Sequence, residues 1–100
     1  MNIKMKQEKQ NLCATPEGRI DAATAPELQE QLMASMNGVR DFTLDLSEVD
    51  YISSAGLRVL VVLQKRMKDQ GSMTIINVRP EITSILKVTG LLKMLNVREA

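Results

Sequence analysis

The residues best placed to do chemistry are two adjacent serines, Ser53 and Ser54, followed closely by Gly56. They lie between a short apolar segment and a long segment with helical periodicity, so we expect both hydroxyls at a helix N-terminus. Unpaired backbone N–H groups and the helix dipole favour negative charge at such a position. A serine there most often caps the helix, but it can also carry a phosphate, which changes the surface that a partner meets.

Other kinds of chemistry have few candidates in this sequence. The chain has no histidine, so the commonest general base and metal ligand are missing. The single cysteine, Cys13, lies in an apolar run and is expected to be a buried, unreactive thiol. There is no Cys/His cluster and no glycine-rich phosphate loop, and Asp45, Glu48 and Asp50 are only a weak acid–base candidate. We therefore predict no catalytic residue, no metal site and no cofactor, and a protein that is not an enzyme.

The composition predicts one globular domain in the cytoplasm. The 100 residues are 44% hydrophobic and 25% charged, which is typical of a folded domain. A net charge of +1 and an aromatic content of 2% argue against binding to nucleic acid or to an anionic membrane. One cysteine fits a reducing compartment, residues 1–10 contain no signal-peptide core, and no apolar run approaches the roughly 18 residues of a membrane span.

Hydrophobic periodicity predicts the element order β-β-α-β-α-β-α. The expected strands, of which the first two should form a hairpin, are residues 2–7, 12–16, 41–46 and 73–78, with a last short strand within 91–97. The first helix should follow Thr24, because the T-x-x-E sequence from Thr24 to Glu27 fits a capping box. That helix is expected to end before Asn37, the second to run over 54–69, and the third to begin at Pro80 and end at Gly90.

The two segments 18–21 and 47–53 are expected to be loops. Asp21 in the first of them fits either a turn residue or a partner contact. The strand–helix–strand unit within 41–78 should be a crossover between parallel strands. Functional groups of α/β folds gather beyond the carboxyl ends of such strands, which is where Ser54 is expected.

The helix predicted over 54–69 has two distinct faces at 100° per residue. The core face is expected to carry Gly56, Leu60, Leu63 and Met67, with Gly56 allowing a close approach to the sheet. The opposite face carries Arg58, Val62, Lys65 and Asp69, and Ser54 and Ala55 project toward it. This face is either an ordinary solvated surface or a docking surface with Ser54 at its rim, and Arg58, four residues later, could pair with a phosphate.

The most specific motifs of the chain are L-D-L-S at 44–47 and Y-I-S-S-A-G-L at 51–57, supported by G-R-I-D at 18–21, T-A at 24–25 and V-T-G-L at 88–91. Together they resemble the STAS domain of the anti-sigma factor antagonist type over nearly the whole chain. The resemblance implies an α/β fold: a single STAS-type domain over 1–100, with a mixed β-sheet of about four to five strands and helices packed mainly on one face.

The resemblance also implies a function. In this family the unphosphorylated antagonist binds an anti-sigma factor that is also a serine kinase and so frees a sigma factor; phosphorylation breaks the complex, and a PP2C-type phosphatase restores it. The family's phosphoserine lies two residues before the motif glycine, which is Ser54 here, and its loop aspartate corresponds to Asp21. Ser53 replaces a frequent aspartate, which leaves open a shift of the phosphorylated position, and Arg58 replaces a frequent glycine, which could alter partner choice.

The expected partner-binding residues are Asp21, Ser53, Ser54, Ala55, Gly56, Arg58, Val62 and Lys65, with Ser54 as the phosphorylation site. We expect a monomer when the protein is free, and no direct contact with nucleic acid or membrane. The alternative is a non-switching STAS subunit of a lipid-transport or sensor complex, in which Ser54 is only a helix cap.

Overall fold

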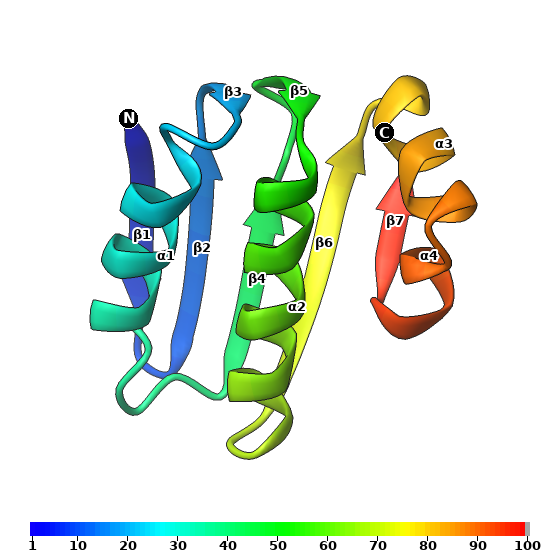
Figure 1. Ribbon diagram of the computed structural model, residues 1–100. Coiled ribbons are helices and arrows are strands. Elements are labelled where there is room, and N and C mark those ends of the chain that lie inside the picture. The colour runs from blue at the N-terminus through cyan, green and yellow to red at the C-terminus, as the bar shows by residue number, and fades with distance from the viewer. Residues whose placement is uncertain (100) are drawn as a thin grey trace.

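The computed structural model describes residues 1–99, which fold around one five-stranded sheet (Figure 1). The strands, in spatial order, are β1 (Ile3–Glu8), β2 (Asn11–Pro16), β4 (Asp41–Asp45), β6 (Ser72–Val78) and β7 (Val97–Glu99). β1 runs antiparallel to β2, and the other neighbours are parallel. Helices α1 (Ala25–Ala34) and α2 (Ser54–Lys68) cover the same face of the sheet (Figure 1). The predicted fold class is confirmed.

The first two strands form the predicted hairpin. Their pairing runs from Ile3 opposite Pro16 to Glu8 opposite Asn11. The chain reverses through two residues, of which Lys9 has a positive φ of 57°. This left-handed conformation matches the twist that tight hairpins require.

The β4–α2–β6 unit is the predicted crossover between parallel strands. β4 pairs with β6 from Asp41 opposite Ser72 to Asp45 opposite Ile76. The predicted core face of α2 is confirmed, because Gly56 and the three apolar residues that follow it on this face are buried. The largest fully buried side chains of these three elements are Phe42, Leu44, Leu60, Leu63, Met67 and Ile75.

The predicted capping box at the start of α1 is wrong. Thr24 occupies the N-cap position, but its backbone is helical (φ −94°, ψ −23°) and its side chain makes no capping hydrogen bond. An N-cap residue whose side chain caps the helix typically has an extended backbone. The Glu27 carboxylate instead contacts the N-terminal amine of Met1 and accepts a hydrogen bond from Gln31. The helix ends at Ala34, as expected before Asn37.

Both segments expected as loops contain a short strand, which corrects that prediction. β3 (Gly18–Ile20) pairs with β5 (Val49–Ile52) in a separate, parallel two-stranded ribbon. Two backbone hydrogen bonds extend this pairing at its ends. The N–H of Gly18 donates to the carbonyl of Glu48, and the N–H of Ser53 donates to the carbonyl of Ile20. The ribbon lies at the end of the sheet where α2 begins (Figure 1).

The C-terminal segment differs in part from the prediction. α3 (Pro80–Val88) begins with proline at the expected position, and Gly90 follows it with a φ of 79°, as expected for a helix-ending glycine. The first half of the expected strand 91–97 is instead the helical turn α4 (Leu91–Met94), and the strand β7 starts only at Val97. Within residues 1–99, no helix is both long and apolar enough to cross a bilayer.

Candidate functional site

The two serines occupy different positions at the start of α2. Ser53 is the N-cap: its backbone is extended (φ −94°, ψ 176°), and its hydroxyl accepts a hydrogen bond of 3.4 Å from the N–H of Gly56. Ser54 is the first helical residue and is exposed. Among residues 1–99, its hydroxyl has no hydrogen-bond partner. The structure therefore gives the capping role to Ser53 and leaves the Ser54 hydroxyl facing solvent.

Gly56 sets the distance between α2 and the β3–β5 ribbon. A Cβ atom at this position would lie 2.6 Å from Cγ2 of Ile20 and 2.6 Å from Cγ1 of Ile52. Both isoleucines are buried, with 0% and 2% of their surface exposed. The close approach expected of Gly56 is thus made to the ribbon. Since Gly56 is buried, it positions the helix rather than presenting a surface.

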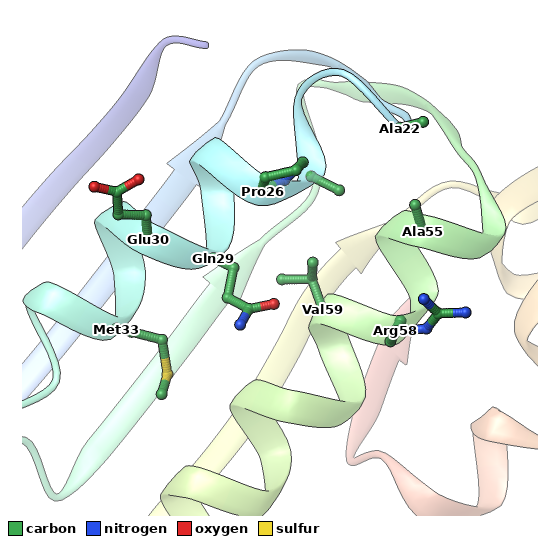
Figure 2. Close-up of a pocket in the computed structure, with 9 residues that line it drawn as sticks. Ala22, Pro26, Gln29, Glu30, Met33, Ala55, Arg58 and Val59 are labelled. Atoms are coloured by element: carbon green, nitrogen blue, oxygen red, sulfur yellow. The ribbon is translucent and has the colours of Figure 1, made fainter.

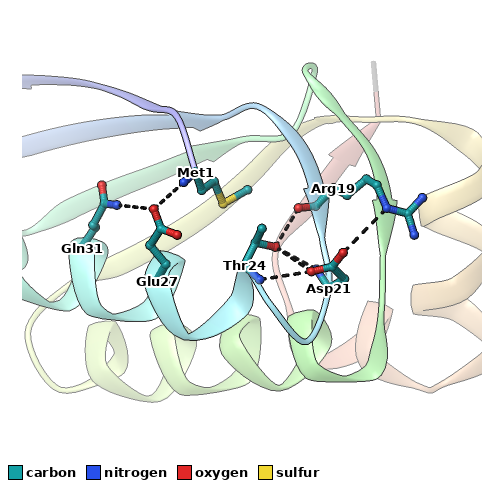
Figure 3. A network of polar contacts seen from close by, with 6 residues as sticks. All are labelled: Met1, Arg19, Asp21, Thr24, Glu27 and Gln31. Atoms are coloured by element: carbon teal, nitrogen blue, oxygen red, sulfur yellow. Dashed lines mark hydrogen bonds and ion pairs between the residues drawn. The ribbon is translucent and has the colours of Figure 1, made fainter.

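Asp21 begins the turn that leads from β3 into α1 (Figure 3). Its Oδ1 accepts hydrogen bonds from the N–H of Ala23 (3.0 Å) and of Thr24 (3.1 Å). The Thr24 hydroxyl accepts from the N–H of Asp21 (2.9 Å) and donates to the carbonyl of Arg19 (2.7 Å). First the N–H of Thr24 and then that of Ala23 hold the pKa of Asp21 below its ordinary value of 3.8. Asp21 is therefore a turn residue in this structure.

The ribbon brings this turn next to the start of α2. Ile20 pairs with Ile52, and the carbonyl of Ile20 accepts the N–H of Ser53 at 2.8 Å. Asp21 directly follows Ile20 on one side of this hydrogen bond, and Ser54 directly follows Ser53 on the other side. Sequence reasoning placed both residues in the site, but the ribbon that joins them was not predicted.

The outer face of α2 is as the helical periodicity predicted. Ser54, Arg58 and Lys65 are exposed, while Ala55 and Val62 are half-buried. Ser54 and Arg58 are four residues apart on one helix, which places their Cβ atoms about 6 Å apart. Apart from the buried Gly56, the site residues on α2 thus form one continuous strip of surface, with a cation within reach of Ser54.

A groove of about 520 Å³ separates this strip from α1. Figure 2 shows Gln29, Met33 and Val59 between the two helices, whereas the guanidinium of Arg58 points away from α1. Val59 is only 3% exposed, although the helical wheel did not place it on the core face. It is buried because α1 packs beside α2, a neighbour that the periodicity of one helix cannot reveal.

One further pair of side chains near the site was missed. The guanidinium of Arg19 on β3 stacks on the ring of Tyr51 on β5, 4.1 Å from its centroid. Arg19 and Tyr51 are partners in the ribbon, so only knowledge of this pairing could have revealed the contact. In the part of the chain that the structure describes, no three His, Cys, Asp or Glu side chains are grouped as a metal site.

Comparison with known proteins agrees with this architecture. The family model of the STAS domain matches residues 2–100. BtrV of Bordetella bronchiseptica, provisionally assigned as an anti-sigma factor antagonist, is 35% identical over 94 residues, which are 89% of this chain and 81% of BtrV. The anti-sigma-B factor antagonist of Bacillus subtilis is 30% identical over 98 residues, which are 97% of this chain and 90% of that protein.

A solved structure shows the same fold. The crystal structure of an anti-sigma factor antagonist from Mycobacterium paratuberculosis superposes with a TM-score of 0.89 at 21% identity, over 99% of this chain and 86% of that one. The two relatives above carry the names of regulatory proteins, which agrees with the prediction that the chain is not an enzyme. The chain therefore belongs to the STAS domain family, among the anti-sigma factor antagonists.

Proposed function

We propose that this protein is a cytoplasmic binding module switched by phosphorylation of Ser54. In its unphosphorylated form it binds an anti-sigma factor that is also a serine kinase, and so releases a sigma factor. The kinase phosphorylates Ser54 and the complex dissociates; a PP2C-type phosphatase then restores the binding form. The names of the relatives support the antagonist role.

One observation carries the assignment of the switch to Ser54. Of the two adjacent serines, Ser53 uses its hydroxyl as the cap of α2, whereas the Ser54 hydroxyl is exposed and has no partner within residues 1–99. A kinase needs an accessible hydroxyl that can be modified without loss of a structural hydrogen bond. Ser54 meets this condition and Ser53 does not.

The proposed mechanism is a local change of charge. A phosphate adds about −1.5 to −2 charge at the rim of the α2 surface. The N-terminus of α2 and the nearby Arg58 can accommodate this charge, because helix N-termini favour anions and arginine pairs well with phosphate. The partner would then be repelled and sterically blocked, while the fold of the antagonist stays the same.

The test is to incubate the purified protein with ATP and each anti-sigma kinase encoded in the same genome. Mass spectrometry then locates any phosphate, and titration calorimetry compares binding before and after phosphorylation. We expect one phosphate on Ser54 and an affinity at least about tenfold lower, a loss of about 1.4 kcal/mol. Stable binding with no phosphate would refute the switch and favour a permanent STAS subunit, and no binding to any kinase would refute the antagonist role.

Three variants separate the serines and the mechanism. Ser53→Ala should lose the helix cap but still accept phosphate, whereas Ser54→Ala should bind the partner and accept none. If Ser53 is the phosphorylated position, these two results exchange. Ser54→Asp should change amide resonances only near the start of α2. Large changes far from that loop would mean that the modification refolds the domain.

A further inference from the structure

Arg19 is an exposed arginine whose orientation is fixed from several directions. Its backbone is paired within the β3–β5 ribbon, and its carbonyl accepts the Thr24 hydroxyl at 2.7 Å. Its guanidinium stacks on the Tyr51 ring at 4.1 Å, and its Nε lies 3.7 Å from Oδ2 of Asp21. The stack holds the plane of the guanidinium, and the ion pair holds one edge of it.

The other edge of this guanidinium is free. Figure 3 shows Nε on the side of Asp21 and the two Nη atoms directed away from it. Neither Nη donates a hydrogen bond to any side chain of residues 1–98 or to the backbone of residues 1–99, and 60% of the Arg19 side chain is exposed. The charge of Asp21 is partly taken up by the two N–H groups on its Oδ1, so it does not neutralise Arg19 fully. The result is a positioned pair of N–H donors that face solvent.

Arg19 also lies beside the surface assigned to the partner. Arg19 is opposite Tyr51 in the ribbon. Because Tyr51 is three residues before Ser54, the Cα atoms of Tyr51 and Ser54 are at most about 10 Å apart. Tyr51 is 39% exposed and is the one large aromatic side chain at the surface of residues 1–99. Arginine and tyrosine are the residue types that most often dominate the binding energy of interfaces.

We propose that Arg19 is a specificity-determining contact of this protein, binding a carboxylate side chain of the anti-sigma factor through its two Nη atoms. The proposal rests on the function proposed above. Two parallel N–H donors fit the two oxygens of a carboxylate, and an arginine that is already oriented loses little conformational freedom on binding. Tyr51 is then a positioning residue, since it holds the guanidinium at the angle that the carboxylate needs.

The experiment measures the affinity of the anti-sigma kinase for the wild-type protein and for variants of Arg19. Loss of a charged, bidentate contact should weaken binding about tenfold to a hundredfold in Arg19→Ala and further in Arg19→Glu. Arg19→Lys should be intermediate, because lysine keeps the charge without the planar fork. The control is Lys6→Glu, which makes the same change of charge at an exposed residue of β1. Its affinity for the partner should lie within about twofold of the wild-type affinity.

A charge reversal in the partner makes the test specific. Each acidic surface residue of the anti-sigma kinase is changed in turn to lysine, and one of these variants should restore binding of Arg19→Glu while weakening that of wild type. Thermal unfolding confirms that each Arg19 variant is folded. Rescue at one position supports the proposed contact.

The failures can be told apart. If wild type binds and the Arg19 variants bind equally well, the Arg19 proposal is wrong and the antagonist role stands. If the Arg19 variants differ from wild type only after phosphorylation, Arg19 serves the Ser54 phosphate and not the partner's carboxylate. If wild type binds no anti-sigma kinase, the proposed function fails, and the Arg19 contact fails with it.

Discussion

Gly56→Ala tests whether the close contact between α2 and the β3–β5 ribbon is required. The added Cβ would lie 2.6 Å from a side-chain carbon of Ile20, 2.6 Å from one of Ile52 and 3.1 Å from the carbonyl oxygen of Ile20. Carbon atoms normally pack 3.5–4.0 Å apart, so the helix and the ribbon must separate by about 1 Å. The carbonyl cannot move freely, because it accepts the N–H of Ser53.

Two opposing effects set the magnitude. Alanine within a helix is favoured over glycine by about 1 kcal/mol, whereas an extra carbon in a tightly packed interior typically costs about 1–3 kcal/mol. Both isoleucines are buried and stiff at χ1, so we expect the upper part of that range. The net loss in the free energy of unfolding should be about 1–2 kcal/mol, which lowers Tm by about 5–15 °C in a domain of this size.

Urea unfolding followed by circular dichroism measures this loss. The matched control is the pair Lys65→Gly and Lys65→Ala, which reports the glycine–alanine difference at an exposed position of the same helix. If Gly56→Ala stabilises the protein by as much as the control pair indicates, the steric argument is wrong. If the argument is right, the amide resonances of Ile20 and Ile52 should shift more than those of β1.

Three further predictions concern polar contacts, two of them at the site and one beyond the far end of α2. Asp21→Asn should be less stable than wild type above about pH 5. Because the pKa of Asp21 in the native state lies below 3.8, the difference in stability should disappear as the pH falls through that native pKa. A difference in Tm that does not depend on pH would contradict this prediction. Gln70→Ala removes the side-chain hydrogen bonds of 2.7 Å to the carbonyls of Met36 and Val39. It should lower the free energy of unfolding by about 1–3 kcal/mol without changing partner affinity. Ser53→Ala should cost about 1 kcal/mol in urea unfolding as the lost N-cap, and a loss below 0.2 kcal/mol would exclude that role.

The parts of the fold that the sequence predicted are those with strong local signals. The hairpin, the crossover from β4 to β6 and the core face of α2 depend on periodic apolar residues over at least five positions. Pro80 and Gly90 mark the ends of α3 through backbone preferences that hold in almost any context. These features needed no knowledge of distant residues.

The ribbon could not be predicted because its signals are short and its pairing is distant. β5 has only four residues, and its two buried ones, Val49 and Ile52, enclose two exposed ones instead of alternating with them. β3 has only three residues, and about thirty residues of sequence separate it from its partner β5. The contact between Arg19 and Tyr51 follows from that pairing and was hidden for the same reason.

The caps show the limit of motif matching. The T-x-x-E sequence at Thr24 fits a capping box, but Asp21 three residues earlier offers a carboxylate, which is a stronger acceptor, and it takes the N–H of Thr24. The adjacent residues Ser53 and Ser54 are equally good caps by type. Only the extended backbone of Ser53 decides between them.

The ribbon also explains why a phosphate on Ser54 should act on the partner and not on the fold. Unfolding the first turn of α2 would expose Leu57 and uncover Ile20 and Ile52, at about 1.5–3 kcal/mol for each side chain. The helix dipole stabilises negative charge at this end by about 0.3–1 kcal/mol, so the phosphate gives the helix no reason to open. If Arg19 attracts a carboxylate of the partner, that carboxylate lies close to Ser54. The phosphate would then repel the group that Arg19 binds, and a charge change at one serine would be enough to separate two folded proteins.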